Sequence, residues 1–365
     1  MKFVFDRKAM MNEIAIAQKI ITTKNALSVL SNVLLTAADG SLEISATDMK
    51  GSFKTKIPVD VEETGSATVL CDKLMSILSA APDGDVEFSL VEKDGVVAVI
   101  KPKSARMKYN LKCIAQDKFP ELPAVKDERF FDVPAKDLKQ MISKTSFSVS
   151  NDVTRYFMSG VYFEKKDDKL VLVATDGRRL SLYSKQIPVS DFRPVIVPPK
   201  ILDIVGQLAD EGNVSLAVGE KVIFFKVGSY EFSEQLVDGQ FPRYEKVIPA
   251  SHTGEFTVQK SDFEKAFKRI SVMADKAGKV ILKASDGALS ISTLNGELGN
   301  ASEEIPCAIS GEGISLAFSC QYVSDFLKVA LNEDLTFEFT DSMRAVVLRQ
   351  KSDEGFIHIL MPMQG

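Results

Sequence analysis

The sequence predicts an α+β protein of three tandem similar domains, and three repeated features support this prediction. A strand-like run that ends in Thr-Asp at residues 42–48 returns at residues 170–176, and in altered form at residues 289–295. Each copy follows a turn signal that contains aspartate. A Phe-Pro pair at residues 119–120 recurs at residues 241–242. Intervals of 128 and 119 residues are the size of a whole small domain and far exceed a solenoid repeat.

Each repeat is expected to contain two helices and several strands. The first helix follows an opening apolar strand, and its apolar residues, such as Met10 and Ile14, recur at three- and four-residue spacing. The second helix is expected at residues 73–78, 199–208 and 321–331. The remaining segments alternate polar and apolar residues, as antiparallel strands with one wet face do. We therefore expect two helices to cover one face of an antiparallel sheet in each repeat.

The domain boundaries are expected at short linkers. Residues 122–126 and 248–254 carry proline, glycine or charge, and neither stretch is long enough to act as a flexible tether. The expected domains are therefore residues 1–124, 125–251 and 252–365. We expect them to hold a fixed relative geometry.

The composition predicts a cytoplasmic protein without a metal or other cofactor. The chain has 365 residues, 45% of them hydrophobic, which suffices for a core in each domain. No apolar run approaches the length of a membrane span, and the N-terminus leads directly into a strand without a signal peptide. The four cysteines form no Cys-x-x-Cys pair, so we expect them to be reduced and structural: Cys71, Cys113, Cys307 and Cys320.

Candidates for catalysis are few. The chain has two histidines, and neither His252 nor His358 has a sequence neighbour that suggests a triad or a metal site. Asp48 and Asp176 occupy matching places in two repeats, and paired carboxylates could hold Mg²⁺. Turn caps are the simpler role, because the two lie in separate domains and the third repeat has Asn295. A metal-dependent nucleic-acid enzyme using both aspartates remains the alternative function.

Charge is distributed unevenly between the helices and the rest of the chain. The expected helices and their entries carry 15 basic and 9 acidic residues, whereas the chain as a whole has a net charge of −5. This layout predicts a positive helical face that suits a polyanion on one side of the molecule. No helix clusters the side chains that read base edges, so binding to nucleic acid would be independent of sequence. A scaffold that binds no nucleic acid is a third possibility.

Three motifs carry a resemblance to a known family. They are Ala-Thr-Asp-Gly-Arg-Arg-Leu at residues 174–180, Leu-Val-Asp-Gly-Gln-Phe-Pro-Arg-Tyr at residues 236–244, and Met-Pro-Met at residues 361–363. Over its whole length the chain resembles the beta subunit of bacterial DNA polymerase III, the sliding clamp. The resemblance implies a DNA-clamp fold and a ring-shaped head-to-tail homodimer, with helices on the inner face and antiparallel sheets outside. It also implies a non-catalytic processivity factor that encircles duplex DNA and tethers the replicative polymerase.

The resemblance also implies a pocket for short peptide motifs of the polymerase catalytic subunit, the clamp loader and other clamp-binding proteins. Three positions depart from the usual family pattern. Arg178 stands where histidine is usual, Ser28 where proline is usual, and Gln364 where a basic residue is usual. The implied pocket residues are Thr175, Gly177, Arg179, Leu180, Pro242, Val247, Met343, Ile359, Met361, Pro362 and Met363, with Arg155 and Phe157 on the rim.

Two further surfaces follow from the resemblance. The positions expected to face DNA are Lys24, Lys73, Tyr156 and Lys200. In the dimer, an edge strand of the first domain should meet the third domain of the partner subunit. Apolar contact flanked by opposite charges would fix the head-to-tail join. The expected interface residues are Arg106, Lys108, Tyr109 and Leu111 in the first domain, and Val272, Met273, Glu303 and Glu304 in the third.

Overall fold

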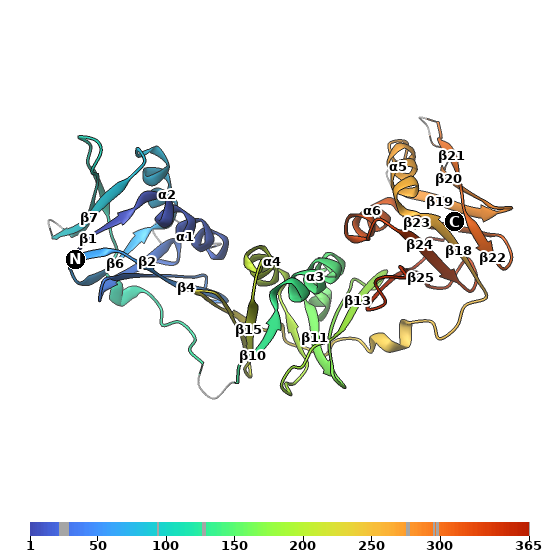
Figure 1. Ribbon diagram of the computed structural model, residues 1–365, viewed down its shortest axis with the longest axis horizontal. Coiled ribbons are helices and arrows are strands. Elements are labelled where there is room, and N and C mark those ends of the chain that lie inside the picture. Colours follow the sequence, from blue (N-terminus) through green and yellow to red (C-terminus); the bar gives the residue numbers. More distant parts are fainter. Residues whose placement is uncertain are drawn as a thin grey trace. The chain divides into compact units, whose positions relative to one another are not determined.

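The computed structural model describes residues 1–21, 29–92, 95–125, 129–274, 278–294, 296 and 299–364. The chain divides into two compact units (Figure 1). Unit 1 comprises Met1–Lys136 with Asp203–Leu236, and unit 2 comprises Asp137–Leu202 with Val237–Gly365. The division runs through the second repeat, because its strands join sheets with the first repeat in unit 1 and with the third repeat in unit 2.

Unit 1 contains a five-stranded sheet with the order β5-β1-β7-β8-β9 and an eight-stranded sheet with the order β10-β15-β16-β17-β4-β3-β2-β6. All strand pairs described in these sheets are antiparallel. The strands are β1 (Lys2–Asp6), β2 (Asn32–Ala38), β3 (Ser41–Thr47), β4 (Gly51–Pro58), β5 (Asp60–Glu63), β6 (Gly65–Leu70), β7 (Asp85–Glu92), β8 (Val96–Pro102), β9 (Tyr109–Lys112), β10 (Phe131–Pro134), β15 (Asn213–Val218), β16 (Val222–Val227) and β17 (Tyr230–Gln235).

Helix α1 (Arg7–Ile20) follows the opening strand of the first repeat, as the sequence predicts. Asp6 caps its N-terminus, because the Asp6 carboxylate accepts a hydrogen bond from the Ala9 amide at 2.9 Å. Its buried face includes Met10 and Ile14, as the apolar spacing predicts, and it packs against β3 and β4. The second helix of the repeat is α2 (Cys71–Ala80).

Unit 2 contains a nine-stranded sheet with the order β14-β11-β12-β13-β26-β25-β24-β18-β22 and a four-stranded sheet with the order β21-β20-β19-β23. Helices α5 (Lys260–Ser271) and α6 (Cys320–Val329) belong to this unit, while α3 (Ala135–Thr145) and α4 (Pro199–Leu208) have residues in both units. The strands are β11 (Val161–Lys166), β12 (Lys169–Thr175), β13 (Arg179–Gln186), β14 (Val195–Val197), β18 (Gly254–Gln259), β19 (Lys279–Ser285), β20 (Ala288–Thr293), β21 (Ser302–Pro306), β22 (Ala308–Ser310), β23 (Ile314–Ser319), β24 (Asp334–Phe339), β25 (Val346–Arg349) and β26 (Phe356–Leu360).

Two sheets run continuously from one repeat into the next. Strand β17 of the second repeat pairs with β4 of the first, and β26 of the third repeat pairs with β13 of the second. The predicted α+β class, the three repeats and the antiparallel sheets are confirmed. Each repeat divides its strands between two sheets, so the junctions between repeats are closed by backbone hydrogen bonds.

One lysine expected on the surface is buried. Lys144 is 3% exposed and forms an ion pair with Asp353, which also accepts a hydrogen bond from the Tyr183 hydroxyl at 3.0 Å. The Lys144 ammonium lies 5.0 Å from the centre of the Phe356 ring. This lysine therefore connects α3 to the third repeat within unit 2 and contributes nothing to a positive helical surface. Among the described residues, no helix is long and apolar enough to cross a membrane.

Candidate functional site

The Thr-Asp marker of the second repeat forms a tight turn after β12. The Thr175 hydroxyl donates to the Arg179 carbonyl at 2.7 Å and accepts from the Gly177 amide at 3.1 Å. The Asp176 carboxylate accepts from the amides of Arg178 and Arg179 at 2.9 and 3.0 Å. Gly177 has φ +87°, and a Cβ there would lie 2.8 Å from the Arg155 guanidinium. The positive φ therefore favours glycine at this position, and any larger residue would also displace the end of the Arg155 side chain.

This turn forms one wall of an apolar cavity of about 230 Å³. The floor is made by the ends of β13 and β26 and by the short helical turn η5 (Tyr244–Val247). Eight of the thirteen predicted pocket residues line this cavity: Thr175, Gly177, Arg179, Leu180, Pro242, Val247, Ile359 and Met361. Beneath it, Leu180 and Ile359 belong to a buried apolar cluster that also includes Phe241 and Tyr244. The cavity is thus backed by a packed core.

A second cavity of about 390 Å³ lies beside the first and shares two residues with it, Arg178 and Met361. Pro362 and Met363 line this second cavity, together with Ser319, Tyr322 and Gln364. The chain end is held by backbone hydrogen bonds, because the Met361 amide donates to the Arg178 carbonyl at 2.9 Å and the Met363 amide donates to the Ala317 carbonyl at 2.7 Å. Met361 therefore forms the ridge between the two cavities, and Pro362 and Met363 line the second cavity alone.

Two further predicted pocket residues, Arg155 and Phe157, lie next to residues that line the first cavity. Arg155 stands beside Gly177 and pairs through Nε with the Asp152 carboxylate at 2.9 Å. Hydrogen bonds from Thr154 and then from Arg155 lower the pKa of Asp152 to about 2. Phe157 packs against the apolar cluster.

Met343 lines neither of these two cavities, so its role in the pocket stays a prediction. Its side chain is 58% exposed. The Met343 amide donates to the Asp341 carboxylate at 2.8 Å, which holds this residue in the turn between β24 and β25.

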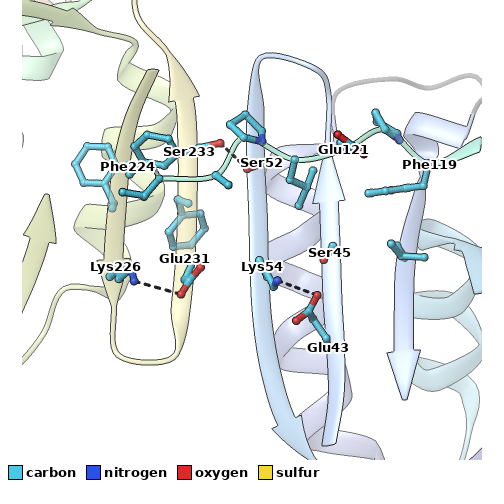
Figure 2. A pocket seen from close by; sticks show the side chains of 18 of the residues that line it. Glu43, Ser45, Ser52, Lys54, Phe119, Glu121, Phe224, Lys226, Glu231 and Ser233 are labelled. Carbon is cyan, nitrogen blue, oxygen red and sulfur yellow. Dashed lines mark hydrogen bonds and ion pairs between the residues drawn. The ribbon is translucent and has the colours of Figure 1, made fainter. Parts of the chain in front are cut away.

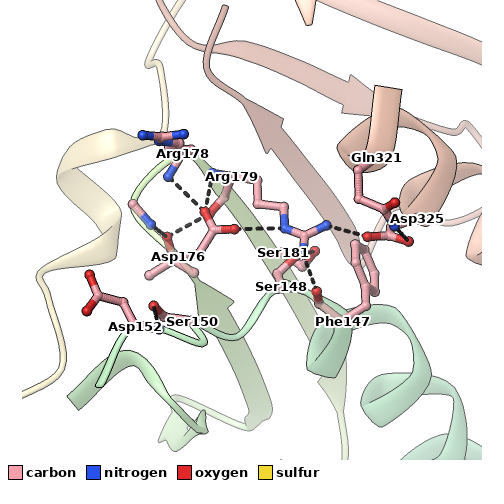
Figure 3. Close-up of polar contacts among 12 residues, drawn as sticks. Phe147, Ser148, Ser150, Asp152, Asp176, Arg178, Arg179, Ser181, Gln321 and Asp325 are labelled. Atoms are coloured by element: carbon pink, nitrogen blue, oxygen red, sulfur yellow. Dashed lines mark hydrogen bonds and ion pairs between the residues drawn. The ribbon is translucent and has the colours of Figure 1, made fainter. Parts of the chain in front are cut away.

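Arg179 lines the cavity, but its guanidinium is already engaged within the protein (Figure 3). It donates to the Asp176 carboxylate at 3.1 Å, to the Asp325 carboxylate at 2.9 Å and to the Phe147 carbonyl at 2.6 Å. It also lies 4.4 Å from the centre of the Tyr322 ring. Arg179 therefore shapes the cavity wall and has little capacity left to bind a ligand.

The predicted pocket omitted four residues that line the first cavity: Met158, Arg178, Arg243 and Tyr244. Arg243 and Tyr244 belong to the Phe-Pro-Arg-Tyr motif, and that motif was the signal that could have identified them. The Tyr244 hydroxyl donates to the Glu164 carboxylate, and burial raises the pKa of Tyr244, with this hydrogen bond adding to the effect. Met158 carries no comparable signal, since it is a single apolar residue in a short helical turn.

The catalytic candidates have structural roles. Nδ1 of His358 lies 2.8 Å from the Ser181 hydroxyl, but both side chains are completely buried, and burial lowers the pKa of His358 to about 3. Asp48 accepts hydrogen bonds from the Lys50 and Gly51 amides, as Asp176 does in its own turn. The part of the chain that the structure describes holds no group of three metal-ligating side chains. Both aspartates therefore act as turn caps, the simpler of the two roles considered for them.

The corresponding junction in unit 1 has a different chemistry. The linker after Phe119 crosses the sheet where β4 pairs with β17, above a cavity of about 560 Å³ (Figure 2). Leu180 faces Ile359 across the second junction, whereas Ser52 faces Ser233 across the first. The Ser52 and Ser233 hydroxyls lie 2.5 Å apart. Ion pairs between Lys54 and Glu43 and between Lys226 and Glu231 complete a polar floor. Equivalent positions are thus apolar at one junction and carry hydroxyl groups at the other, although apolar residues such as Phe119, Phe224 and Phe232 also line the cavity of the first junction.

The residues expected to face DNA are partly described. Lys73 is exposed on α2, Tyr156 is 53% exposed, and Lys200 is half-buried near the start of α4. Lys24 lies outside the described residues.

The predicted interface residues lie on two open sheet edges, one in each unit. Tyr109 and Leu111 are in β9, the last strand of the five-stranded sheet, which Arg106 and Lys108 precede. Glu303 and Glu304 are in β21, the last strand of the four-stranded sheet. Val272 and Met273 follow α5, and Val272 is 79% exposed.

Comparison with known proteins identifies the family. Models of the N-terminal, central and C-terminal domains of the DNA polymerase III beta subunit match residues 1–123, 132–243 and 245–364. The beta sliding clamp of Treponema pallidum is 38% identical over 372 residues, which cover the whole of both chains. The DNA polymerase sliding clamp from Bacillus subtilis is 25% identical with a TM-score of 0.94, covering 100% of this chain and 99% of that chain. A sliding clamp from Bartonella birtlesii bound to griselimycin is 29% identical with a TM-score of 0.92, and all of both chains is covered.

Three tandem α+β repeats, with sheets continuous across their junctions and an apolar cavity at one of them, define a protein of the DNA-clamp fold. The three domain models match in order and cover most of the chain. The chain belongs to the DNA polymerase III beta subunit family, the beta sliding clamps.

Proposed function

We propose that this chain is a DNA sliding clamp, a processivity factor that encircles duplex DNA and tethers the replicative polymerase to it. The observation that carries the proposal is the ordered match of all three clamp domains along the chain. The proposed domains are residues 1–124, 125–251 and 252–365. The protein acts without catalysing a reaction, and its place of action is the cytoplasm.

The proposed assembly is a ring-shaped head-to-tail homodimer. Strand β9 and strand β21 each end a sheet, and an open edge is a ready surface for a further strand. The two edges differ in charge, since Arg106 and Lys108 flank one and Glu303 and Glu304 lie on the other. Such edges are complementary to each other but not to themselves, which favours a head-to-tail join. In one subunit Glu303 is paired with Arg269 through Nε at 2.9 Å, so it must share or exchange this partner when the ring closes.

DNA is proposed to contact the protein through scattered basic and aromatic side chains. Lys73 and Tyr156 are exposed, and exposed lysines and arginines on α5 and α6 add positive charge. Contacts of this kind bind the phosphate backbone regardless of sequence and weaken with salt. Retention on DNA would then depend on the closed ring rather than on affinity.

The apolar cavity is the proposed docking site for short peptide motifs of the polymerase catalytic subunit, the clamp loader and other clamp-binding proteins. Its concave apolar lining, with a methionine at the lip, suits anchors of differing shape. We propose this cavity as the peptide site of unit 2.

Loading on circular DNA tests the proposed function. The clamp is loaded on a nicked circle by a clamp loader, and half of the sample is then linearised with a restriction enzyme. We expect the protein to remain on circles at high salt and to leave linear molecules rapidly, because only an end releases a closed ring. The matched control is the Val272→Asp, Met273→Asp double variant, whose interface should not close. Equal loss from circular and linear DNA would contradict encirclement.

A further inference from the structure

The cavity of about 560 Å³ in unit 1 has no role in the proposed function. It lies between the sheet and residues 119–125, which we call the strap, and the described residues that line it all belong to unit 1 (Figure 2). Its floor contains the facing pair Ser52 and Ser233, which corresponds to the facing apolar pair of β13 and β26 in unit 2. The repeated fold therefore provides a cavity at each junction, and the two cavities have different linings.

Short side chains at the centre of the floor leave room under the strap. Ser52 and Ser233 lie in register on β4 and β17, and Ser45 of β3 also lines the cavity. A serine fills much less volume than leucine or isoleucine, and this cavity is accordingly larger than the cavity of about 230 Å³ in unit 2. The space is large enough for side chains of a ligand.

The charged side chains of this cavity leave one carboxylate unpaired. Lys54 pairs with Glu43 at 3.0 Å, and Lys226 pairs with Glu231 at 3.5 Å. Glu121 of the strap also lines the cavity, and its exposed carboxylate forms no hydrogen bond or ion pair within the described part of the chain. An incoming cation therefore finds a free partner, whereas an anion would have to compete with a carboxylate for either lysine.

Apolar side chains form much of the rest of the lining. Phe119 and Leu122 of the strap are half-buried, and Phe224 of β16 is buried. Phe130 also lines the cavity, and its ring centre lies 4.7 Å from the Lys226 ammonium. A ligand can therefore bury an aromatic or leucine side chain here while a charged group stays at the exposed Glu121.

The backbone of the strap is restrained and is open to a ligand. Pro120 and Pro123 fix part of its conformation, which reduces the entropy that binding would cost. An extended segment with free amides beside a concave surface is an arrangement to which a second extended chain can add. Four strap amides form no hydrogen bond within the part of the chain that the structure describes: Glu121, Leu122, Ala124 and Val125.

We propose that this strap cavity is a second docking site, which binds an extended peptide segment of a partner protein with a basic side chain near an aromatic or leucine anchor. The basic side chain pairs with Glu121, and the anchor packs against Phe119 and Leu122. A nucleic acid does not fit, because both lysines of the cavity are already paired and the free charge is negative. The site is independent of the cavity in unit 2, so one chain can hold two different partners.

A peptide series tests this site. The probes are acetyl-Ser-Phe-Ser-Ser-Leu-Ser-amide and its variants with Lys or Gln in place of each serine, titrated by calorimetry onto the full-length protein. The titrations are repeated on the protein truncated after Leu360, which lacks Met361 of the cavity in unit 2. In both proteins we expect Lys at one or more positions to bind about threefold more tightly than Gln at low salt, as for an exposed ion pair. This preference should fade at high salt.

Hydrogen exchange followed by mass spectrometry locates the bound peptide. The unbonded amides of the strap should exchange rapidly in the free protein, and the tightest Lys peptide should slow exchange at residues 119–125. The same protection is expected in the protein truncated after Leu360.

Variants assign the preference to its residue. Glu121→Gln should remove the preference for Lys and leave the affinity for the Gln peptides unchanged. Its side chain is exposed and unpaired, so the fold should persist. The control is Asp117→Asn, which removes a carboxylate from an exposed residue of the preceding helical turn η2 (Gln116–Lys118) that does not line the cavity, and it should preserve the preference.

The outcomes separate this inference from the proposed function. If no peptide of the series protects the strap, or if protection is confined to residues 361–364, the second site is overturned, while the proposed clamp function is unaffected. If Lys and Gln peptides bind equally well, or if Glu121→Gln retains the preference, the proposed class of basic partner is overturned.

Discussion

Arg179 and Asp325 form an ion pair with 2.9 Å between Nη1 and Oδ2, and this pair joins the second repeat to the third within unit 2. Arg179 begins β13 and lines the first cavity, while Asp325 lies on α6. Both side chains are largely buried. The wall of the candidate site is therefore part of the connection between two repeats, and the shape of the cavity depends on that connection.

Loss of the Asp325 carboxylate should destabilise unit 2. We expect Asp325→Asn to lower the free energy of unfolding by about 2 kcal/mol, the range for a hydrogen bond to a charged group. Burial raises the pKa of Asp325, but hydrogen bonds from Arg179, Lys328 and Gln321 outweigh it, and the net pKa is lowered. The contribution of this carboxylate is therefore present above the unfolded pKa and is lost as pH falls through the folded pKa.

Urea unfolding at pH 7 and at pH 4 measures this effect. The difference between the wild type and Asp325→Asn should narrow at the lower pH. Lys328→Ala is the control, because its partner is the same carboxylate but its side chain is 68% exposed, and it should cost less than about 0.5 kcal/mol. A larger loss of unfolding free energy for Lys328→Ala than for Asp325→Asn would contradict the view that Arg179 is the main partner of this carboxylate.

The sequence predicted much of the site because its motifs are local. Thr175 to Leu180 form one turn and the start of one strand, and the hydrogen bonds that Thr175 and Asp176 make with backbone groups stay within that turn. The geometry of such a segment follows from its own residues. Eight pocket residues could accordingly be placed around one cavity, although their role in binding stays a prediction.

What the sequence could not predict depends on partners that are distant in the chain. Strand β4 pairs with β17, and β13 pairs with β26. Many other strand edges were available for pairing, and no local sequence pattern specifies which edges meet. Lys144 appeared to be a surface residue because its partner Asp353 is 209 residues away. Met343 was placed in the pocket by resemblance alone, and the turn that holds it away from the lining is not visible in any periodicity.

The buried Glu13 of α1 should make the stability of unit 1 depend on pH. Its carboxylate accepts a hydrogen bond from the Tyr230 hydroxyl at 3.2 Å, and the side chain is 7% exposed. Burial raises its pKa, and hydrogen bonds with Tyr230 and Thr55 oppose the shift only in part. The folded state thus favours the neutral form, so stability is highest below the unfolded pKa and falls as pH rises through the folded pKa.

Replacement by glutamine, which mimics the neutral acid, should remove this dependence. We expect Glu13→Gln to raise the free energy of unfolding at pH 8, because the neutral amide avoids the cost of burying a charged carboxylate. The gain should shrink toward pH 5, as urea unfolding at both pH values can show. The exposed Glu92→Gln serves as the matched control. A gain that is equal at both pH values would exclude titration of Glu13 as the cause.

The proposed ring should dissociate when charge is placed on its apolar contact. Val272→Asp with Met273→Asp would bury unpaired carboxylates in the interface, and we expect monomers at micromolar concentration by analytical ultracentrifugation. The exposed position of Val272 implies that the folded subunit tolerates the change. Val153→Asp, at a side chain that is 87% exposed and outside the proposed interface, should remain dimeric. If the double variant still sediments as a dimer, the interface does not include Val272 and Met273.

Truncation after Leu360 should weaken peptide binding without opening the ring. It removes Met361, which lines both cavities, and Met363, whose amide bonds to Ala317. Loss of this ridge should cost about 2 kcal/mol or more in peptide affinity, the scale of a hot-spot residue. Leu360 itself is 1% exposed and remains, so β26 keeps its pairing with β13. Calorimetric titration of a peptide with a Leu or Phe anchor compares the truncated and full-length dimers, and deletion of Gly365 alone is the control. Equal affinities would mean that partners dock away from the Met-Pro-Met end, whereas loss of the dimer would mean that this end also supports the interface.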